Sequence, residues 1–311
     1  MPVAEKSLIS QIRSRAGNAR GIIGIGDDCA CIRIPDGQEA LITTDFSLED
    51  IHFRRKWQPA SSVGHRCLLR GLSDIAAMGG TPIAVFLSLA LPAKLPQRWV
   101  DEFLGGLLKL ASKFAVPLAG GDTSKSPQKI LADIVVLGSV PKRKAILRSG
   151  ARPGDRIFAT GTLGGAATTL AALLRGHGKK IPAADLDRYF YPSPRVDVGR
   201  ILREKGLATS MIDISDGLST DLSHICEESK VGAELIADAI PHSETDLRFA
   251  LHGGEEYELL FTAPAKTAIP ARIANVPITE IGKIVRGRKM SLQIGGKLQK
   301  LVPEGWEHFR K

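Results

Sequence analysis

Most of the aspartates suited to chemistry in this sequence lie where predicted strands end, beside glycine, serine or threonine, and one, Asp74, lies late in a predicted helix. They lie in G-I-G-D-D at residues 24–28, T-T-D at 43–45, S-D at 73–74, G-G-D-T at 120–123 and D-I-S-D-G at 213–217. Several carboxylates at loop junctions are costly to bring together unless cations neutralise them. Hard oxygen ligands favour Mg²⁺, which bridges carboxylates to phosphates. The pattern therefore predicts metal-assisted phosphate chemistry.

Each of these segments alone has a structural alternative. Gly-Asp pairs are common in turns, and Ser215 or Asp216 is equally suited to be the N-cap of a helix. The motifs of other reactions are absent: there is no P-loop, no dinucleotide fingerprint, no protein-kinase H-R-D or D-F-G, and no G-x-S-x-G nucleophile elbow. Acid–base and acyl chemistry therefore have little support.

Composition sets the broad class of the protein. The chain has 311 residues, 43% of them hydrophobic and 24% charged, which is ordinary for a globular protein and excludes disorder, collagen and coiled coil. No apolar run approaches the roughly 20 residues of a membrane span, and the N-terminus has no signal core. The net charge of +9 comes from scattered bases, which favours small polyanionic substrates over nucleic acid. We expect a soluble, cytoplasmic protein.

The cysteines support the same class. Cys29, Cys31, Cys67 and Cys226 are too few and too irregularly spaced for a disulfide framework or a zinc site. Reduced thiols in the cytoplasm are the simpler interpretation.

The elements that must position the aspartates alternate between strand and helix. In the first half we predict strands at 22–34, 39–45, 82–91 and 130–140 and helices at 61–78 and 97–114. This order indicates a mixed sheet with helices on one face. Because the runs 83–91 and 131–137 are apolar on both faces, the other face of the sheet must also be covered, which favours a two-fold dimer.

A stretch rich in bases, glycine and proline at 142–155 separates the two halves. The second half restarts with predicted strands at 156–160, 208–214, 232–237, 258–263 and 278–285 and helices at 166–174, 195–205 and 217–229. We therefore predict an α/β (α+β) fold with two domains, residues 1–145 and 146–311.

Seven segments follow one another along nearly the whole chain. They are G-I-G-D-D-C-A, T-T-D-F-S-L-E-D-I-H-F, L-S-D-I-A-A-M-G-G-T-P, G-G-D-T, L-R-S-G-A-R-P-G-D, D-I-S-D-G-L-S-T-D-L and G-G-E-E-Y-E-L. Each is weak alone, but the ordered set is specific. Together they resemble the thiamine-monophosphate kinase (ThiL) family, within the superfamily of aminoimidazole-ribonucleotide synthetase and selenophosphate synthetase.

The resemblance implies ATP-dependent phosphorylation of thiamine phosphate to thiamine diphosphate. It also implies a homodimer whose N-terminal domains, which bind ATP and Mg²⁺, build a shared β-barrel, with active-site clefts completed by the C-terminal domains. The implied Mg²⁺ ligands are Asp28, Thr43, Thr44, Asp45, Asp74, Asp122, Asp213 and Asp216. The implied ATP contacts are Gly121, Asp122, Arg148 and Ser215, and the implied thiamine phosphate contacts are His52, Glu255 and Trp306. K⁺ is a further candidate cofactor.

The chemistry of the acceptor agrees with this assignment. The nucleophile is a phosphate oxygen that is already ionised near neutral pH, because the second phosphate pKa is about 6. No general base is needed, and Mg²⁺ ions neutralise the repulsion between ATP and the acceptor in a direct, in-line transfer. Without the resemblance, His52 would be an ordinary strand-end histidine and Trp306 a packing residue.

Two positions depart from the family pattern, which often has Gly where this chain has Asp50 and Asp where it has Glu256. Selenophosphate synthetase would need a reactive cysteine before Cys29, and none occurs. An enzyme like aminoimidazole-ribonucleotide synthetase stays open as an alternative. A non-catalytic nucleotide- or cation-binding module is the alternative from another class, although no EF-hand pattern is present.

Overall fold

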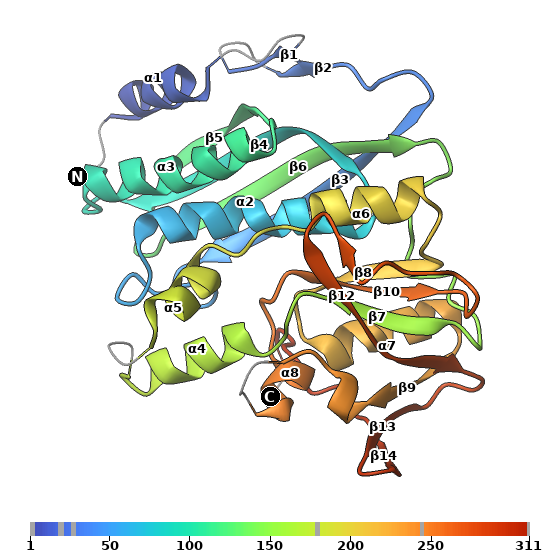
Figure 1. The fold of residues 1–311 in the computed structure, drawn as a ribbon. Coiled ribbons are helices and arrows are strands. Elements are labelled where there is room, and N and C mark those ends of the chain that lie inside the picture. Colours follow the sequence, from blue (N-terminus) through green and yellow to red (C-terminus); the bar gives the residue numbers. More distant parts are fainter. Residues whose placement is uncertain (1–3, 18–21, 26–28, 178–180, 243–245, 310–311) are drawn as a thin grey trace. The chain divides into compact units, whose positions relative to one another are not determined.

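The computed structural model describes the chain except residues 1–3, 18–21, 26–28, 178–180, 243–245 and 310–311. It divides into two compact units (Figure 1). The first comprises the chain up to Ile75 together with Thr81–Arg143, and the second comprises Ala76–Gly80 together with the chain from Lys144. Each unit contains a mixed sheet and helices, so the predicted mixed α/β class is confirmed.

The first unit has a four-stranded main sheet. Its elements are α1 (Glu5–Ala16), β1 (Ile22–Ile23), β2 (Cys31–Ile32), β3 (Gln38–Leu48), α2 (Ala60–Ala77), β4 (Thr81–Pro92), α3 (Gln97–Lys113), β5 (Leu118–Ser126) and β6 (Leu131–Pro141). The strand order is β3-β6-β4-β5, in which only β4 and β5 run parallel. The end strands β3 and β5 do not pair, so these described strands form an open sheet.

Most of the predicted elements of this unit are confirmed to within a few residues. The exception is the predicted strand at 22–34, of which the described part holds only the short antiparallel pair β1 and β2. Two elements, α1 and β5, were not predicted.

Glycines set how closely α2 packs. A Cβ atom at Gly64 would lie 1.9 Å from the carbonyl oxygen of Phe103 on α3, so the two helix backbones touch there. A Cβ at Gly71 would lie 2.4 Å from Val136 on β6, so α2 lies directly over the sheet. Together α2 and α3 cover one face of this sheet (Figure 1).

The other face of the sheet carries exposed apolar side chains. Along β3, successive side chains alternate between the two faces. Leu41 and Ser47 point to the covered face and are buried, whereas Ile42 and Phe46 point away and are 72% and 55% exposed. The described residues of one chain therefore leave apolar surface on this face open to solvent.

The second unit has an eight-stranded sheet. Its elements are β7 (Arg156–Thr160), α4 (Gly165–Leu174), α5 (Ala183–Phe190), α6 (Val196–Glu204), β8 (Ser210–Ile214), α7 (Leu218–Ser229), β9 (Gly232–Ile236), a 3₁₀ turn (Ala237–Ala239), α8 (Leu247–His252), β10 (Glu258–Ala263), β11 (Arg272–Ile273), β12 (Val276–Val285), β13 (Met290–Ile294) and β14 (Lys297–Lys300). The strand order is β14-β13-β9-β12-β7-β10-β8, with β11 paired to β12. All eight elements predicted for this half are present.

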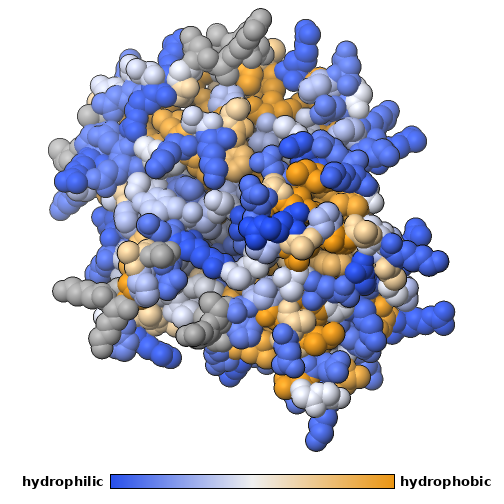
Figure 2. Space-filling model, in the orientation of Figure 1, coloured by the Kyte–Doolittle hydropathy of each residue, from blue (hydrophilic) through white to orange (hydrophobic). Residues whose placement is uncertain are grey.

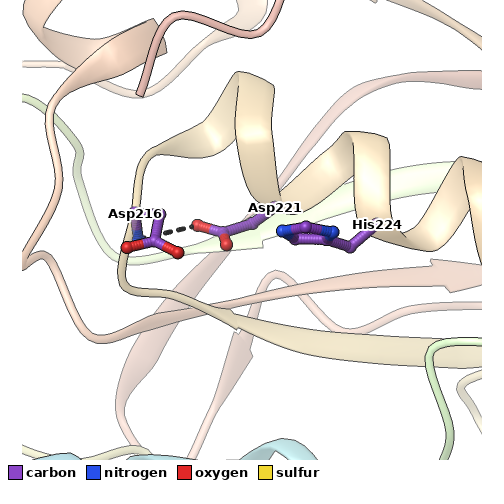
Figure 3. Close-up of side chains that lie close together, drawn as sticks. All are labelled: Asp216, Asp221 and His224. Carbon is purple, nitrogen blue, oxygen red and sulfur yellow. Dashed lines mark hydrogen bonds between the residues drawn. The ribbon is translucent and has the colours of Figure 1, made fainter. Parts of the chain in front are cut away.

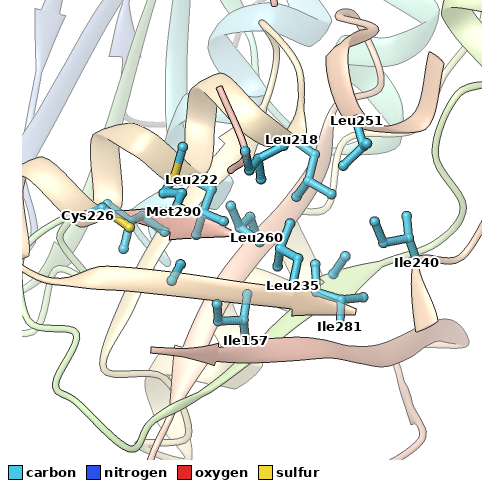
Figure 4. Packing of buried hydrophobic residues seen from close by; sticks show 14 of the residues in the cluster. Ile157, Leu218, Leu222, Cys226, Leu235, Ile240, Leu251, Leu260, Ile281 and Met290 are labelled. Atoms are coloured by element: carbon cyan, nitrogen blue, oxygen red, sulfur yellow. The ribbon is translucent and has the colours of Figure 1, made fainter. Parts of the chain in front are cut away.

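A hydrophobic core holds α7 against this sheet (Figure 4). Leu218 and Leu222 of α7 pack with Ile157 of β7 and Leu260 of β10, and all four are at most 2% exposed. This packing fixes the start of α7, which directly follows the D-I-S-D-G segment.

The distribution of hydrophilic side chains on the surface is consistent with the scattered positions of the charged residues in the sequence. On the face seen in Figure 2, hydrophilic side chains are spread over both units, with apolar patches between them. Among the described residues, no helix is both long and apolar enough to cross a membrane.

Candidate active site

The first group of predicted ligands lies where β3 passes under the end of α2. Thr43 and Asp45 point to the covered face of the sheet, and Asp74 reaches them from the last turns of α2. The hydroxyl of Thr43 donates a hydrogen bond to Asp74 Oδ2. Burial, followed by the charge of Asp74, raises the pKa of Asp45 to about 7, and a hydrogen bond joins the two carboxyl groups. In the absence of a cation, the pair therefore holds a proton well above the ordinary range of aspartate.

Arg70 is a member of this group that sequence reasoning missed. Its Nη1 atom donates to the carbonyl oxygen of Phe46 at 2.9 Å and to Ser47 Oγ at 2.7 Å. Its charge opposes the rise in the pKa of Asp45. The signal was its spacing, because residues i and i+4 share a helix face and Arg70 lies one turn before Asp74.

Thr44 lies on the opposite face of the sheet from Thr43 and Asp45. Its hydroxyl donates to Asp133 Oδ1 of β6 at 2.7 Å. Strand alternation therefore splits the predicted T-T-D ligand set, and the side chain of Thr44 does not join the Asp45–Asp74 pair.

Gly121 and Asp122 lie at the far edge of the sheet, on β5. Gly121 has φ +149°, and a Cβ there would lie 1.8 Å from the carbonyl oxygen of Leu87, so only glycine fits. Asp122 lies opposite Ser88 of β4. Two strands, β6 and β4, separate β5 from β3, so at the usual spacing of about 4.8 Å between neighbours β5 and β3 lie about 14 Å apart. Within one chain Asp122 does not reach the Asp45–Asp74 pair.

A cavity of about 760 Å³ lies beside these two residues. Its walls include Ile9 and Ile12 of α1, Phe86 of β4 and Leu118 of β5. Thr123 lines the cavity, and its Oγ1 atom is buried with no hydrogen-bond partner among the described residues. An apolar cavity with a few polar groups is typical of a site for a small organic ligand.

His52 lies in a tight turn after β3. The backbone N–H of Leu48 donates to His52 Nδ1 at 3.0 Å, so the neutral ring carries its proton on Nε2. Asp50 has φ +72°, a left-handed conformation in which glycine is usual and aspartate is tolerated. Lys129 forms an ion pair with Asp50, and its hydrogen bond lowers the pKa of that carboxyl. The departure from Gly at this position is therefore accommodated.

The second group of predicted ligands follows β8. Asp213 is buried near the end of this strand, and the turn 215–217 leads into α7. The N-cap of α7 is Gly217, so the alternative in which Ser215 or Asp216 caps the helix is wrong. Instead, Asp221 Oδ2 accepts the backbone N–H groups of Ser215, Asp216 and Gly217 at 3.1, 3.2 and 3.0 Å. The side chains of Ser215 and Asp216 are thus not used in capping.

Asp216, Asp221 and His224 point toward one another (Figure 3). One ligand atom from each lies within 4.8 Å of the others. Burial raises the pKa of Asp216, against the opposing charges of His224, His308 and Arg148, and burial also raises the pKa of Asp221. Asp221 and His224 were not predicted from the sequence, although both lie in the first two turns of α7.

The G-G-E-E loop before β10 lies against the 215–217 turn. The backbone N–H of Glu255 donates to the carbonyl oxygen of Ser215 at 2.7 Å. A Cβ at Gly254 would lie 2.7 Å from the same oxygen, so glycine is required for this approach. Glu255 itself has φ +65°, which is uncommon for a residue with a side chain and typical of functional loops.

The segment after β14 carries Trp306 to the same turn. The backbone N–H of Trp306 donates to the carbonyl oxygen of Asp216 at 2.9 Å, and Gly305 N donates to Thr220 Oγ1 at 3.1 Å. Trp306 is 54% exposed, so it is not part of the core.

The structure thus forms two groups of predicted site residues, each within one unit. The first is Thr43, Asp45 and Asp74, and the second is Asp213, Ser215, Asp216, Arg148, Glu255 and Trp306. Thr44, His52, Gly121 and Asp122 lie elsewhere in the first unit. Asp28 lies outside the described residues.

Comparison with known proteins gives one consistent result. Residues 26–140 match the family model "AIR synthase related protein, N-terminal domain", and residues 152–295 match its C-terminal counterpart. The chain is 37% identical to the thiamine-monophosphate kinase of Escherichia coli K12 over 99% of both chains.

Two solved structures are similar along nearly their whole length. The thiamine-monophosphate kinase of Stenotrophomonas maltophilia K279a has a TM-score of 0.83 at 33% identity, covering 96% of this chain and 99% of its own. The structure described as AaThiL complexed with AMPPCP and TMP has a TM-score of 0.80 at 30% identity, covering 99% of this chain and 97% of its own. The chain therefore belongs to the thiamine-monophosphate kinase family of AIR synthase related proteins.

Proposed function

We propose that this protein transfers the γ-phosphoryl group of ATP to the phosphate of thiamine phosphate, forming thiamine diphosphate in one direct, in-line, Mg²⁺-assisted step. Relatives that share 30–37% identity over almost the full chain carry the same kinase name or hold the ligands AMPPCP and TMP. The observation that carries the proposal is the Asp45–Asp74 carboxyl pair, which is held together at the cost of a strongly raised pKa.

The donor set fits Mg²⁺. Asp45, Asp74 and Thr43 offer only oxygen atoms, which this ion prefers. A proton shared between two carboxyl groups marks a place where a cation would relieve repulsion. Asp213 and Asp216 offer a second oxygen set at the end of β8. When bound there, Mg²⁺ supplies neutralisation of the phosphate charges and of the charge on the transferring group.

The remaining residues bind and orient the two substrates. His52 presents Nε2–H as a donor for the acceptor phosphate, because its Nδ1 atom is already occupied by Leu48 N–H. Arg148 and Ser215, which lie close to Asp216, would bind the ATP phosphates. Trp306 is exposed and suited to stack on the cationic thiazolium ring, an interaction worth about 1–2 kcal/mol.

The cavity beside Gly121 is the proposed site of the adenosine part of ATP. Its apolar walls suit a planar ring, and Thr123 Oγ1 would gain a hydrogen-bond partner there. Residues 1–145 would then form the ATP, Mg²⁺ and dimerisation domain, and residues 146–311 the domain that completes the site. We place the enzyme in the cytoplasm, with K⁺ as a candidate activator.

A homodimer is part of the proposal. The exposed Ile42 and Phe46 lie on the open face of the first unit's sheet, which a two-fold partner would cover. The strand β5, which carries Asp122, lies about 14 Å from β3 within one chain, which supports a site completed by a second copy. Pairing two such faces would give the shared sheet that the sequence predicts.

A substrate panel tests the proposed function. The protein is incubated with ATP and Mg²⁺, with or without K⁺, and with thiamine phosphate, free thiamine or an aminoimidazole-ribonucleotide precursor. We expect ADP and thiamine diphosphate in equal amounts with thiamine phosphate alone. Turnover of the aminoimidazole precursor instead would establish the alternative enzyme, and ATP binding without turnover of any acceptor would indicate a binding module.

A further inference from the structure

The first turn of α7 carries three consecutive polar side chains, those of Ser219, Thr220 and Asp221. Side chains of this kind near the start of a helix often satisfy backbone groups of the helix itself. In this protein all three accept hydrogen bonds from backbone N–H groups that lie outside α7. Ser219 and Asp221 are at most 1% exposed, so solvation does not explain their polar atoms. The first turn of α7 therefore connects the helix to other segments of the second unit.

Asp221 fixes the turn that precedes the helix. Its Oδ2 atom accepts the backbone N–H groups of three successive residues, 215–217, at 3.0–3.2 Å. Figure 3 shows the bond to the backbone nitrogen of Asp216. One carboxyl oxygen thus sets the course of the backbone that carries Ser215 and Asp216, the residues proposed above to bind the ATP phosphates and Mg²⁺. A buried N–H group without an acceptor is costly, so loss of this oxygen would release the turn.

Thr220 holds the segment that carries Trp306. Residues 301–309 lie in no helix or strand, so the position of this segment depends on individual contacts. The backbone N–H of Gly305 donates to Thr220 Oγ1 at 3.1 Å. The next residue, Trp306, donates its N–H to the carbonyl oxygen of Asp216 at 2.9 Å. A Cβ at Gly305 would lie 2.2 Å from that carbonyl oxygen, so only glycine allows this approach. Because Trp306 is half exposed, these backbone contacts, and not packing in the core, set its position.

Ser219 joins the same helix turn to two further groups. Its hydroxyl oxygen accepts the backbone N–H of Glu304 at 3.4 Å and forms a hydrogen bond of 2.8 Å with His252 Nδ1. His252 is the last residue of α8, and the G-G-E-E loop follows it directly. Glu255 of that loop donates its N–H to the carbonyl oxygen of Ser215. The loop is thus held both where it leaves α8 and where it meets the turn before α7.

These contacts give the first turn of α7 one common property. The segments that it holds are the turn 215–217, the segment 304–306 and the loop 253–256, which carry residues assigned above to the two substrates. The contacts are unequal. Thr220 binds the segment 304–306, whereas Asp221 binds the turn to which that segment is itself bonded through Asp216. Release of the turn would therefore also loosen the segment, but release of the segment would leave the three bonds of Asp221 intact.

We propose that the first turn of α7 positions the two substrates relative to each other: Asp221 holds the turn that binds the ATP phosphates, and Thr220 holds Trp306 beside that turn for the acceptor. The assignment rests on the proposed function, from which it takes the roles of Ser215, Asp216 and Trp306. Asp221 and Thr220 are positioning residues, because each acts through backbone N–H groups of another segment. A change at Thr220 thus affects acceptor binding alone, whereas a change at Asp221 affects both substrates.

The first test is a pair of substitutions at Thr220. Thr220→Val has nearly the same shape but removes the oxygen that accepts Gly305 N–H. We expect KM for thiamine phosphate to rise about fivefold, with kcat and KM for ATP within about twofold of the wild type. Thr220→Ser keeps the hydroxyl group and should restore the wild-type KM. The matched control is Ser223→Ala, which removes a hydroxyl group that donates to the carbonyl oxygen of Thr220 within the same helix, and it should leave both KM values unchanged.

The second test is a pair of substitutions at Asp221. Asp221→Ala removes the acceptor of three backbone N–H groups and should raise KM for both ATP and thiamine phosphate by about tenfold or more. Asp221→Asn keeps an oxygen that can accept these bonds and should hold KM for ATP within about threefold of the wild type. The melting temperature of each variant shows whether it is folded. If Asp221→Ala does not fold, Asp221→Asn alone decides the role of this residue.

The outcomes distinguish this proposal from the proposed function. If the wild-type protein forms thiamine diphosphate but Thr220→Val leaves both KM values unchanged, or raises both equally, the role of Thr220 is refuted and the kinase assignment stands. Equal impairment of Thr220→Ser and Thr220→Val refutes it as well, because the hydroxyl group would not be the cause. A folded Asp221→Asn protein whose KM for ATP rises about tenfold or more refutes the role of Asp221. If thiamine phosphate is not phosphorylated under any condition, the proposed function fails and this assignment fails with it.

Discussion

The carboxyl groups of Asp45 on β3 and Asp74 on α2 are hydrogen-bonded to each other, although both groups would be ionised in water at neutral pH. The packing of α2 directly on the sheet brings the two together. The two carboxyl groups offer oxygen ligands of the kind that Mg²⁺ prefers, which is why we propose that they bind this ion.

This pair predicts how the stability of the metal-free protein depends on pH. The pKa of Asp45 is raised in the folded state from 3.8 to about 7, so the folded state binds its proton more tightly than the unfolded chain does. The resulting stabilisation is present below pH 3.8 and is lost as pH rises to about 7. We expect Asp45→Asn to flatten this part of the pH profile of the melting temperature.

Because other buried carboxyl groups titrate in the same direction, the difference between wild type and Asp45→Asn is the quantity to measure. Mg²⁺ should raise the melting temperature of the wild type at pH 8 and have a smaller effect on the variant. Identical profiles for the two proteins with and without Mg²⁺ would contradict the metal assignment.

Arg70 is expected to support the same group. Replacing it with methionine removes a charged donor from Phe46 O and Ser47 Oγ and removes a cation whose charge lowers the pKa of Asp45, so this pKa should rise further. We predict that Arg70→Met lowers the free energy of unfolding by about 1–3 kcal/mol in urea titrations. Arg98→Met, at an exposed ion pair on α3, is the control and should change it by about 0.5 kcal/mol or less. Equal effects of the two substitutions would show that Arg70 has no special role.

The turn that carries His52 gives a prediction about backbone strain. Asp50 has φ +72° and is exposed, so Asp50→Gly should relieve strain while losing the ion pair with Lys129. We expect the melting temperature to change little. Asp50→Val should lower it, since a β-branched residue is strained in this conformation. A stable Asp50→Val protein with unchanged activity would contradict the left-handed turn.

The open sheet face of the first unit predicts self-association. Light scattering coupled to gel filtration should give about twice the chain mass of 33.3 kDa at low micromolar concentration. Phe46→Glu should shift the protein to monomer, whereas Ile236→Glu, at a similarly exposed apolar residue of the second unit, should not. A wild-type protein that is monomeric and fully active would refute the proposed dimer with a shared sheet, and the kinase assignment would still stand.

Elements with a strong apolar pattern were predictable from the sequence. α2, α3 and β4 carry regular buried positions and were found almost to the residue. β5 was missed because L-A-G-G-D-T-S-K-S has neither alternation nor β-branched residues beyond one threonine, and its pairing with β4 makes it a strand. α1 was missed because only Leu8 and Ile12 of its twelve residues are buried.

The candidate site was predictable in its residue types but not in its geometry. The family resemblance predicted Thr44 and Asp122 as metal ligands. Their positions away from Asp45 follow from the faces and the order of the strands, which depend on tertiary pairing and not on the local sequence. The same holds for Glu256, whose hydrogen-bond partner is the backbone at the start of α4. No local pattern reports a contact between residues 90 positions apart, such as that between Glu256 and Ala166.

Formation of thiamine diphosphate by the purified protein is the most direct test of the proposed activity. With ATP, Mg²⁺ and thiamine phosphate, we predict one thiamine diphosphate per ADP, no reaction of free thiamine, and a loss of kcat of about 100-fold or more in Asp213→Asn, with the exposed control Asp238→Asn unaffected. Rapid phosphorylation of free thiamine would require a general base to remove the proton of its hydroxyl group, and the proposed mechanism includes none. That result, or full activity of Asp213→Asn in limiting Mg²⁺, would contradict metal-assisted transfer to the phosphate of thiamine phosphate.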